Sequence, residues 1–168
     1  MSTTTNPVSD FAAGRYPRAS EWQGWSDALQ ALTDPWTTYT PTLGASGGSP
    51  AIGSGGILTG RYYQAYKKVG FEIQLTCGGS GLSFGTGGVT LTLPVAVKTS
   101  LNRTFDGLFY DSSGSANYPI LGLVSGSTLF LRQWPSTAGN PLALFTGTSP
   151  VTVASGDTIE MWGEYETS

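Results

Sequence analysis

Carboxylate side chains have the greatest capacity for catalysis in this sequence, because the chain contains no histidine. Without histidine, Ser-His-Asp and Cys-His nucleophile systems cannot form, and the usual zinc, copper and non-haem iron sites are excluded. A pair of carboxylates could still hydrolyse a glycosidic bond. The candidate pairs are Glu160 with Glu164 and Asp106 with Asp111.

Glu160 and Glu164 belong to a segment with the alternating pattern of a strand. Their side chains should point to the same face, about 13 Å apart along the strand. This separation is too wide for a glycosidase, whose carboxyl groups are about 5–9.5 Å apart. We therefore expect solvated residues on an outer face and no enzyme activity, while a carboxylate pair across two strands stays open. Trp162 shares the parity of both glutamates, and a tryptophan on a polar face indicates an interface.

The glycine-rich tracts and the single cysteine could also carry chemistry, but a structural role explains each of them better. The glycine-rich tracts 78–81 and 85–88 lack the Lys-Ser/Thr ending of a phosphate loop and precede a strand pattern, so we expect turns. Cys77 is the single cysteine, which excludes an internal disulfide. It ends an apolar face and is predicted to be a small core residue. We expect no cofactor.

Aromatic residues make up 12% of the chain and are the main candidates for ligand binding. They could stack on sugar rings, or they could fill the core and the contacts between subunits, and we favour the second interpretation because strands prefer aromatics. The residues concerned are Tyr62, Tyr63, Tyr66, Tyr110, Tyr118, Trp134 and Trp162. Of these, Tyr63, Tyr118, Trp134 and Trp162 are the predicted ligand or interface surface.

The N-terminal segment is predicted to consist of an arm followed by a docking helix. Residues 1–18 are rich in Ser, Thr, Asn, Pro and Gly and are expected to form an extended arm. Residues 19–35 are expected to form one short α-helix that ends at Asp34-Pro35, with Trp22 and its apolar partners on one stripe. Such a short helix is marginal alone in water, so it should dock either on its own β-domain or on copies of itself. The predicted assembly residues are Tyr16, Trp22, Trp25, Leu29, Leu32 and Trp36.

Residues 36–168 are predicted to form one antiparallel β-sandwich or jelly-roll-like domain, because strand patterns alternate with glycine-rich turns. Apolar residues alternate with polar ones in two clear strands, at 71–77 and 89–93. Further strands are expected at 57–66, 105–110, 120–124, 128–133, 143–146 and 159–165. Loops are expected at 44–56 and 78–88, hairpin connections at 67–70 and 125–127, and a turn at 155–157.

Charge and hydropathy limit the partners. Charged residues make up 11% of the chain and the formal net charge is −3. This predicts no binding to nucleic acid or to an anionic membrane. The first residues lack the basic and apolar parts of a signal peptide, and no apolar run is long enough to span a bilayer. We therefore expect a protein that is made in the cytoplasm and is not exported by a signal peptide.

Three stretches resemble a module of virion proteins from phages that infect actinobacteria, known as minor tail proteins. They are the opening WTTYTPTL at 36–43, ILTGRY at 57–62 followed by VGFEI at 69–73, and VTLTLP at 89–94. The resemblance covers roughly residues 36–97; it departs from the family in the loop 45–56, and residues 98–154 are unmatched. It implies a trimeric β-sandwich displayed on a phage particle and joined to it through the N-terminal segment. It carries over no catalytic residue.

The predicted function is therefore that of a structural component of a bacteriophage virion. The leading hypothesis is a trimeric tail-fibre or tail-tip protein, attached through its arm and helix, with an exposed β-domain that could bind a host cell-wall glycan. The alternative is a capsid decoration protein or head fibre. A third hypothesis, from another class, is a small polysaccharide depolymerase. The expected partners are copies of this chain, other proteins of the tail or capsid, and the glycan.

Overall fold

The computed structural model describes residues 20, 22–24, 26, 30, 36–98, 103–134 and 142–167. The chain divides into two compact units, Met1–Pro35 and Trp36–Ser168. In the first unit, the described residues are helical, as predicted for this segment, and the Trp22 side chain is exposed. Among the described residues, no helix has the length and hydrophobicity needed to cross a membrane. The arm 1–18 and the predicted assembly residues Tyr16, Trp25, Leu29 and Leu32 lie outside the described residues.

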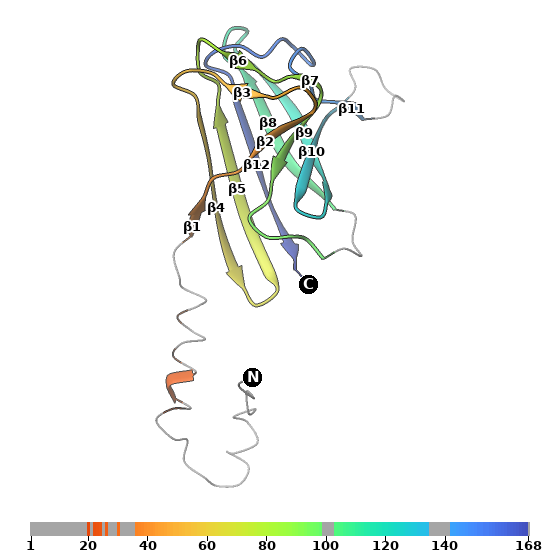
Figure 1. The fold of residues 1–168 in the computed structure, drawn as a ribbon. Coiled ribbons are helices and arrows are strands. Elements are labelled where there is room, and N and C mark those ends of the chain that lie inside the picture. Colours follow the sequence, from red (N-terminus) through yellow and green to blue (C-terminus); the bar gives the residue numbers. More distant parts are fainter. Residues whose placement is uncertain are drawn as a thin grey trace. The chain divides into compact units, whose positions relative to one another are not determined.

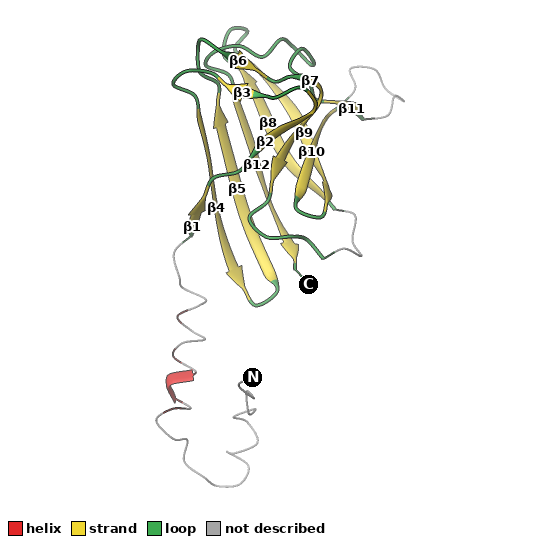
Figure 2. Ribbon diagram, in the orientation of Figure 1, coloured by secondary structure: helices red, strands yellow, loops and turns green. Residues whose placement is uncertain are grey.

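The second unit is built from strands, which confirms the all-β prediction (Figures 1 and 2). The strands are β1 Thr37–Tyr39, β2 Leu43–Gly47, β3 Ala51–Ile52, β4 Ile57–Ala65, β5 Lys68–Thr76, β6 Leu82–Ser83, β7 Thr86–Thr92, β8 Thr104–Asp111, β9 Ala116–Ser125, β10 Thr128–Gln133, β11 Ala143–Leu144 and β12 Thr158–Glu166. Ten of them form one curled antiparallel sheet in the order β1-β4-β5-β12-β8-β9-β10-β7-β2, with β11 beside β10. β3 and β6 form a small second sheet.

The large sheet is continuous rather than divided. A sandwich or jelly roll, the finer prediction, consists of two sheets packed face to face. Here β12 pairs with β5 along one side and with β8 along the other, so the two halves of the sheet are joined by hydrogen bonds. Figure 1 shows β5 and β12 side by side in the middle of the domain. The sheet encloses its core by curling.

The two ends of the strand order are consecutive in the chain. β1 pairs with β4, and β2 pairs with β7 at the other end of the sheet. Between them, the Thr42 amide donates to Thr92 Oγ1 at 2.8 Å, and the Thr92 amide donates to the Thr42 carbonyl at 3.2 Å. The opening stretch 36–43 is thus divided between two strands. The break contains Pro41, which has no amide hydrogen to donate to a ladder. Residues 37–47 consequently supply the strands at both ends of the strand order.

The core follows the predicted alternation. The apolar side chains of the strand at 71–77 and of the strand at 89–93 are buried, as are Ile159, Met161 and Tyr165 of the last strand. Phe71 packs its ring edge-on against Phe105 at 5.0 Å between centroids, and Tyr165 lies beside both rings. The Tyr165 hydroxyl donates to the Val95 carbonyl at 2.7 Å, which satisfies its polar end inside the domain. Cys77 is buried as predicted, and burial raises the pKa of its thiol to about 12.

Two loop predictions and one turn prediction need correction. Residues 44–56 and 78–88 contain strand segments, because β3 and β6 pair with each other and β2 pairs with β7. Glycine permits this close approach: a Cβ at Gly78 would lie 2.4 Å from the Ser54 carbonyl oxygen. The connection between β4 and β5 is Tyr66 and Lys67 rather than 67–70, since Ala65 already pairs with Lys68. The turns predicted at 125–127 and 155–157 are confirmed.

Candidate functional site

The outer face of β4, β5 and β12 carries a row of polar and aromatic side chains. Arg61 on β4 lies opposite Glu72 on β5, which lies opposite Trp162 on β12. The Arg61 guanidinium contacts the Glu72 carboxylate through Nε at 2.7 Å and through Nη2 at 2.5 Å. Both side chains are about half exposed, so this ion pair contributes little to stability, on the order of 0–1 kcal/mol. Its main effect is to hold two polar groups in fixed positions.

Trp36, a predicted assembly residue, is positioned at the edge of this face. Its ring lies 4.9 Å from the Arg61 guanidinium carbon and contacts the Tyr63 ring edge-on at 5.1 Å between centroids. The cation-π contact and the aromatic contact restrict an indole that is 37% exposed. Trp36 therefore belongs to the surface of the β-domain, where it extends the polar and aromatic row.

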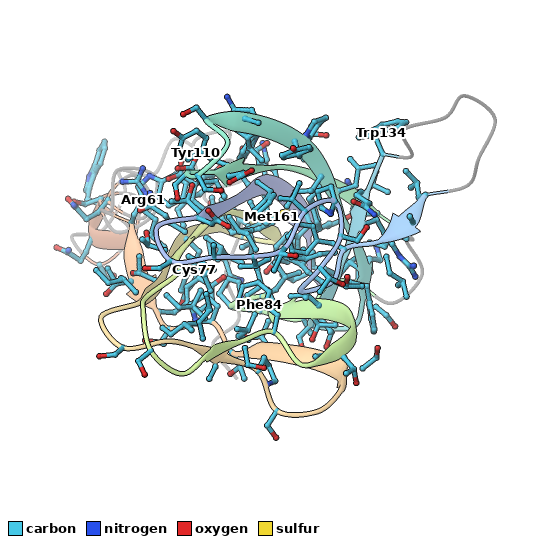
Figure 3. All side chains as sticks on the ribbon, turned by 90° about the horizontal axis from the view of Figure 1, so that it is seen from above. Arg61, Cys77, Phe84, Tyr110, Trp134 and Met161 are labelled. Atoms are coloured by element: carbon cyan, nitrogen blue, oxygen red, sulfur yellow. The ribbon has the colours of Figure 1, made fainter. Side chains whose placement is uncertain are left out.

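An open groove of about 550 Å³ lies on this face. Trp162, 44% exposed, lines it together with the ion-paired Arg61 and Glu72. Glu160 accepts a hydrogen bond from the Gln74 side-chain amide at 3.3 Å, so both of these lining residues are also oriented. The complete lining is Thr38, Thr59, Gly60, Arg61, Glu72, Ile73, Gln74, Glu160, Met161 and Trp162. In Figure 3, Arg61 lies at the rim of the domain.

Next to the groove, Glu164 is held from two sides. Its carboxylate is 2.7 Å from Lys68 Nζ and accepts a hydrogen bond from the Tyr63 hydroxyl. The Lys68 contact, followed by the Tyr63 contact, lowers the pKa of Glu164, and the same carboxylate raises the pKa of both partners. Tyr63 reaches Glu164 by crossing Gly70, where a Cβ would lie 2.2 Å from the Tyr63 ring. A glycine between these two residues is therefore required for the contact.

Of the candidate carboxylates, Glu160, Glu164 and Asp111 are each engaged by residues outside their candidate pairs. Glu160 and Glu164 lie on the outer face as predicted, but each is engaged by a different polar neighbour. Asp106 is exposed, whereas Asp111 is buried and caps the following turn by accepting from the Ser113 amide and hydroxyl and from the Gly114 amide. These hydrogen bonds lower the pKa of Asp111, the Gly114 contact most strongly. Within the described ranges, no group of three or more Cys, Asp or Glu residues could hold a metal ion.

The predicted aromatic surface is divided by the structure. Trp36, Tyr63 and Trp162 lie on the same outer face, while Tyr118 packs against the core beside Phe109 at 6.0 Å between rings. Trp134 is 58% exposed, and Figure 3 shows it on the opposite side of the domain from Arg61. Tyr118 thus supports the favoured interpretation that aromatics fill the core. Trp36, Tyr63 and Trp162 remain on the outer face.

Sequence reasoning missed Arg61, Glu72 and Gln74 as members of this face. The signal was present in the alternation along β5, where Glu72 lies between the buried Phe71 and Ile73. It could not be used because the hairpin connection was placed too late in the chain. A two-residue turn at 66–67 would have set Arg61 opposite Glu72.

Comparison with protein-family models, curated proteins and solved structures finds no match for this chain. A function must therefore be argued from the surface just described and from the sequence.

Proposed function

We propose that this chain is a structural and binding component of a bacteriophage virion, a trimeric tail-fibre or tail-tip protein attached through residues 1–35. In this proposal, the outer face of β4, β5 and β12 binds a host cell-wall glycan. The virion assignment rests on the resemblance of residues 36–97 to minor tail proteins. The observation that carries the binding role is the groove in which exposed Trp162 lies beside polar side chains that already hold one another.

The chemistry of this groove suits a sugar. An exposed indole offers a flat apolar surface to the C–H face of a pyranose ring, while carboxylate, amide and guanidinium groups can bond its hydroxyls. Glu72 and Glu160 are each oriented by a hydrogen bond before any ligand arrives. Such preorganisation reduces the entropy lost when a ligand binds.

The connection between the two units suits attachment. The first residues of the β-domain lead into residues 37–47, which pair with β4 at one edge of the sheet and with β7 at the other. A load applied through residues 1–35 would thus be shared by two strands that are far apart in the strand order. This supports a display domain that is tethered at its N-terminal end.

Native mass spectrometry should detect a homotrimer that persists on dilution. Leu29→Glu places a charge on the predicted apolar stripe and should shift the equilibrium toward monomer by more than about tenfold, which corresponds to about 1.4 kcal/mol. Gln30→Glu adds the same charge at an exposed helical residue and is the matched control. A wild-type chain that is monomeric at all concentrations would contradict the trimer.

Trp162→Ala should weaken binding of the fluorescently labelled protein to host cells or to isolated wall polysaccharide. Loss of an exposed aromatic anchor is expected to lower affinity by about 30-fold, or about 2 kcal/mol. Trp134→Ala removes another exposed indole, on the other side of the domain, and should leave binding unchanged. Equal binding by wild type and Trp162→Ala would exclude this groove as the binding site.

Labelled antibody on intact particles, viewed by electron microscopy, distinguishes a tail protein from a capsid decoration protein.

A further inference from the structure

A second groove, of about 460 Å³, lies on the outer face of β8, β9 and β10. Arg103 and Arg132 line it together with the apolar side chains of Leu123 and Phe130. The Nε atoms of both arginines are buried, and neither has a hydrogen-bond partner among the residues that the structure describes. Native proteins rarely leave buried donors unsatisfied, and two in one groove require an explanation.

The arginines of this groove combine lack of an ion pair with buried donors. Arg61, Lys68 and Lys98 each form an ion pair with a glutamate, and Lys67 lies in an exposed turn. Within the described part of the chain, Arg103 and Arg132 form no such pair. Two uncompensated positive charges therefore meet in one groove of a chain whose net charge is −3. This favours an anionic ligand from outside the chain.

We propose that this groove binds a carboxylate-bearing sugar unit of an acidic glycan. A guanidinium group presents parallel N–H donors that match a carboxylate in a bidentate contact. Phe130, which is 39% exposed, offers a ring surface to the C–H face of the same sugar. Because both Nε atoms are closed to solvent, the guanidinium groups must turn toward the groove on binding, and the carboxylate then supplies the missing acceptor.

The dimensions of the groove favour a sugar unit over a protein partner. Its volume lies within the range of small-ligand sites, about 300–1,000 Å³. A stable protein interface covers about 800 Å² on each partner, which one groove of this size does not supply. The inference goes beyond the proposed function, since it concerns a different groove and requires neither a virion nor a trimer.

Isothermal titration of the full chain with oligogalacturonate tests the proposal, with uncharged maltoheptaose and polyglutamate as comparison ligands. Oligogalacturonate should bind, and its affinity should fall as salt is added. Arg103→Gln and Arg132→Gln should each weaken binding by about 10-fold. Lys67→Gln removes the same charge from an exposed turn and should bind like wild type.

Arg132→Met separates a binding role from a structural one. It keeps the length of the side chain and removes the unsatisfied donor, so Tm should rise by about 2–4 °C while oligogalacturonate binding weakens by about 10-fold, as in Arg132→Gln. A fall in both Tm and binding would mark Arg132 as structural and count against the site. The proposal is overturned if wild type fails to bind oligogalacturonate at millimolar concentration, if maltoheptaose binds equally well, if polyglutamate binds more tightly, or if the glutamine variants bind unchanged.

Discussion

Phe109→Ala is expected to lower the free energy of unfolding by about 3–5 kcal/mol, the largest effect that we predict for a single substitution. The Phe109 ring is fully buried on β8 and packs edge-on against Phe145 at 5.1 Å between centroids. It also lies beside Tyr118 of β9. Removing the ring loses the free energy gained by burying it. It also leaves a cavity that the closely packed neighbouring side chains cannot fill. Urea unfolding followed by tryptophan fluorescence measures the change.

Phe130→Ala is the matched control for this prediction. Phe130 is the same residue type in the neighbouring part of the sheet, but it points outward and is 39% exposed. Its replacement should cost less than about 1 kcal/mol, because partly exposed surface positions leave no closed cavity. Similar losses for both variants would show that Phe109 does not occupy the core position described above.

Asp157→Ala should lower the free energy of unfolding by about 3 kcal/mol, since it leaves three partly buried donors without an acceptor. The carboxylate is completely buried in the turn before β12. It accepts from the Ser112 amide at 2.9 Å, from the Ser112 hydroxyl at 3.1 Å and from the Ala154 amide at 2.7 Å. One side chain thus joins the turn after β8 to the turn that precedes β12, and its loss should loosen both.

Two further variants make the result specific. Asp157→Asn keeps the shape and one acceptor oxygen, so about half of the loss, or about 1–2 kcal/mol, is expected. Asp106→Ala removes an exposed carboxylate that forms no hydrogen bond or ion pair with any described residue, and it should change stability by less than about 0.5 kcal/mol. If Asp157→Ala were as mild as Asp106→Ala, the buried carboxylate would not be joining the two turns.

The two predictions also bear on the proposed binding face. β12 carries Glu160, Trp162 and Glu164 on its outer side and buries Ile159, Met161 and Tyr165 on its inner side. A turn fixed by Asp157 and a core filled by Phe109 therefore determine where the outer side chains lie. Variants that loosen either one should weaken ligand binding as a consequence of lost order, whereas Trp162→Ala should weaken binding without lowering Tm.

Much of the fold was predictable because side-chain alternation is a local property of a strand. The spacing of Phe71, Ile73 and Leu75 correctly predicted which face of β5 is buried, and the same reasoning placed Glu160 and Glu164 on the outer face. The turns at 125–127 and 155–157 were predictable because Gly126 and Gly156 adopt positive φ, which glycine accepts at little cost.

The candidate site was less predictable because it depends on register between strands. Tyr63 and Glu164 are 101 positions apart in the chain, and they meet because Gly70 lies between them on β5. A one-residue error in the hairpin turn changes every pair along β4 and β5, so Arg61 could not be matched with Glu72 from the sequence. The short strands β3 and β6 were missed because their pairing involves backbone in glycine-rich segments with few side-chain signals.

The sequence by itself determined that this protein is all-β, that histidine-dependent catalysis is impossible, and which residues of each clear strand are buried. These properties depend on composition and on a period of two residues. Only the tertiary structure decided that β12 joins the strands into one curled sheet, that residues 37–47 hold both of its edges, and which polar residues share a groove. Such pairings are set by hydrogen bonds and packing between segments distant in the chain, and no local pattern encodes them.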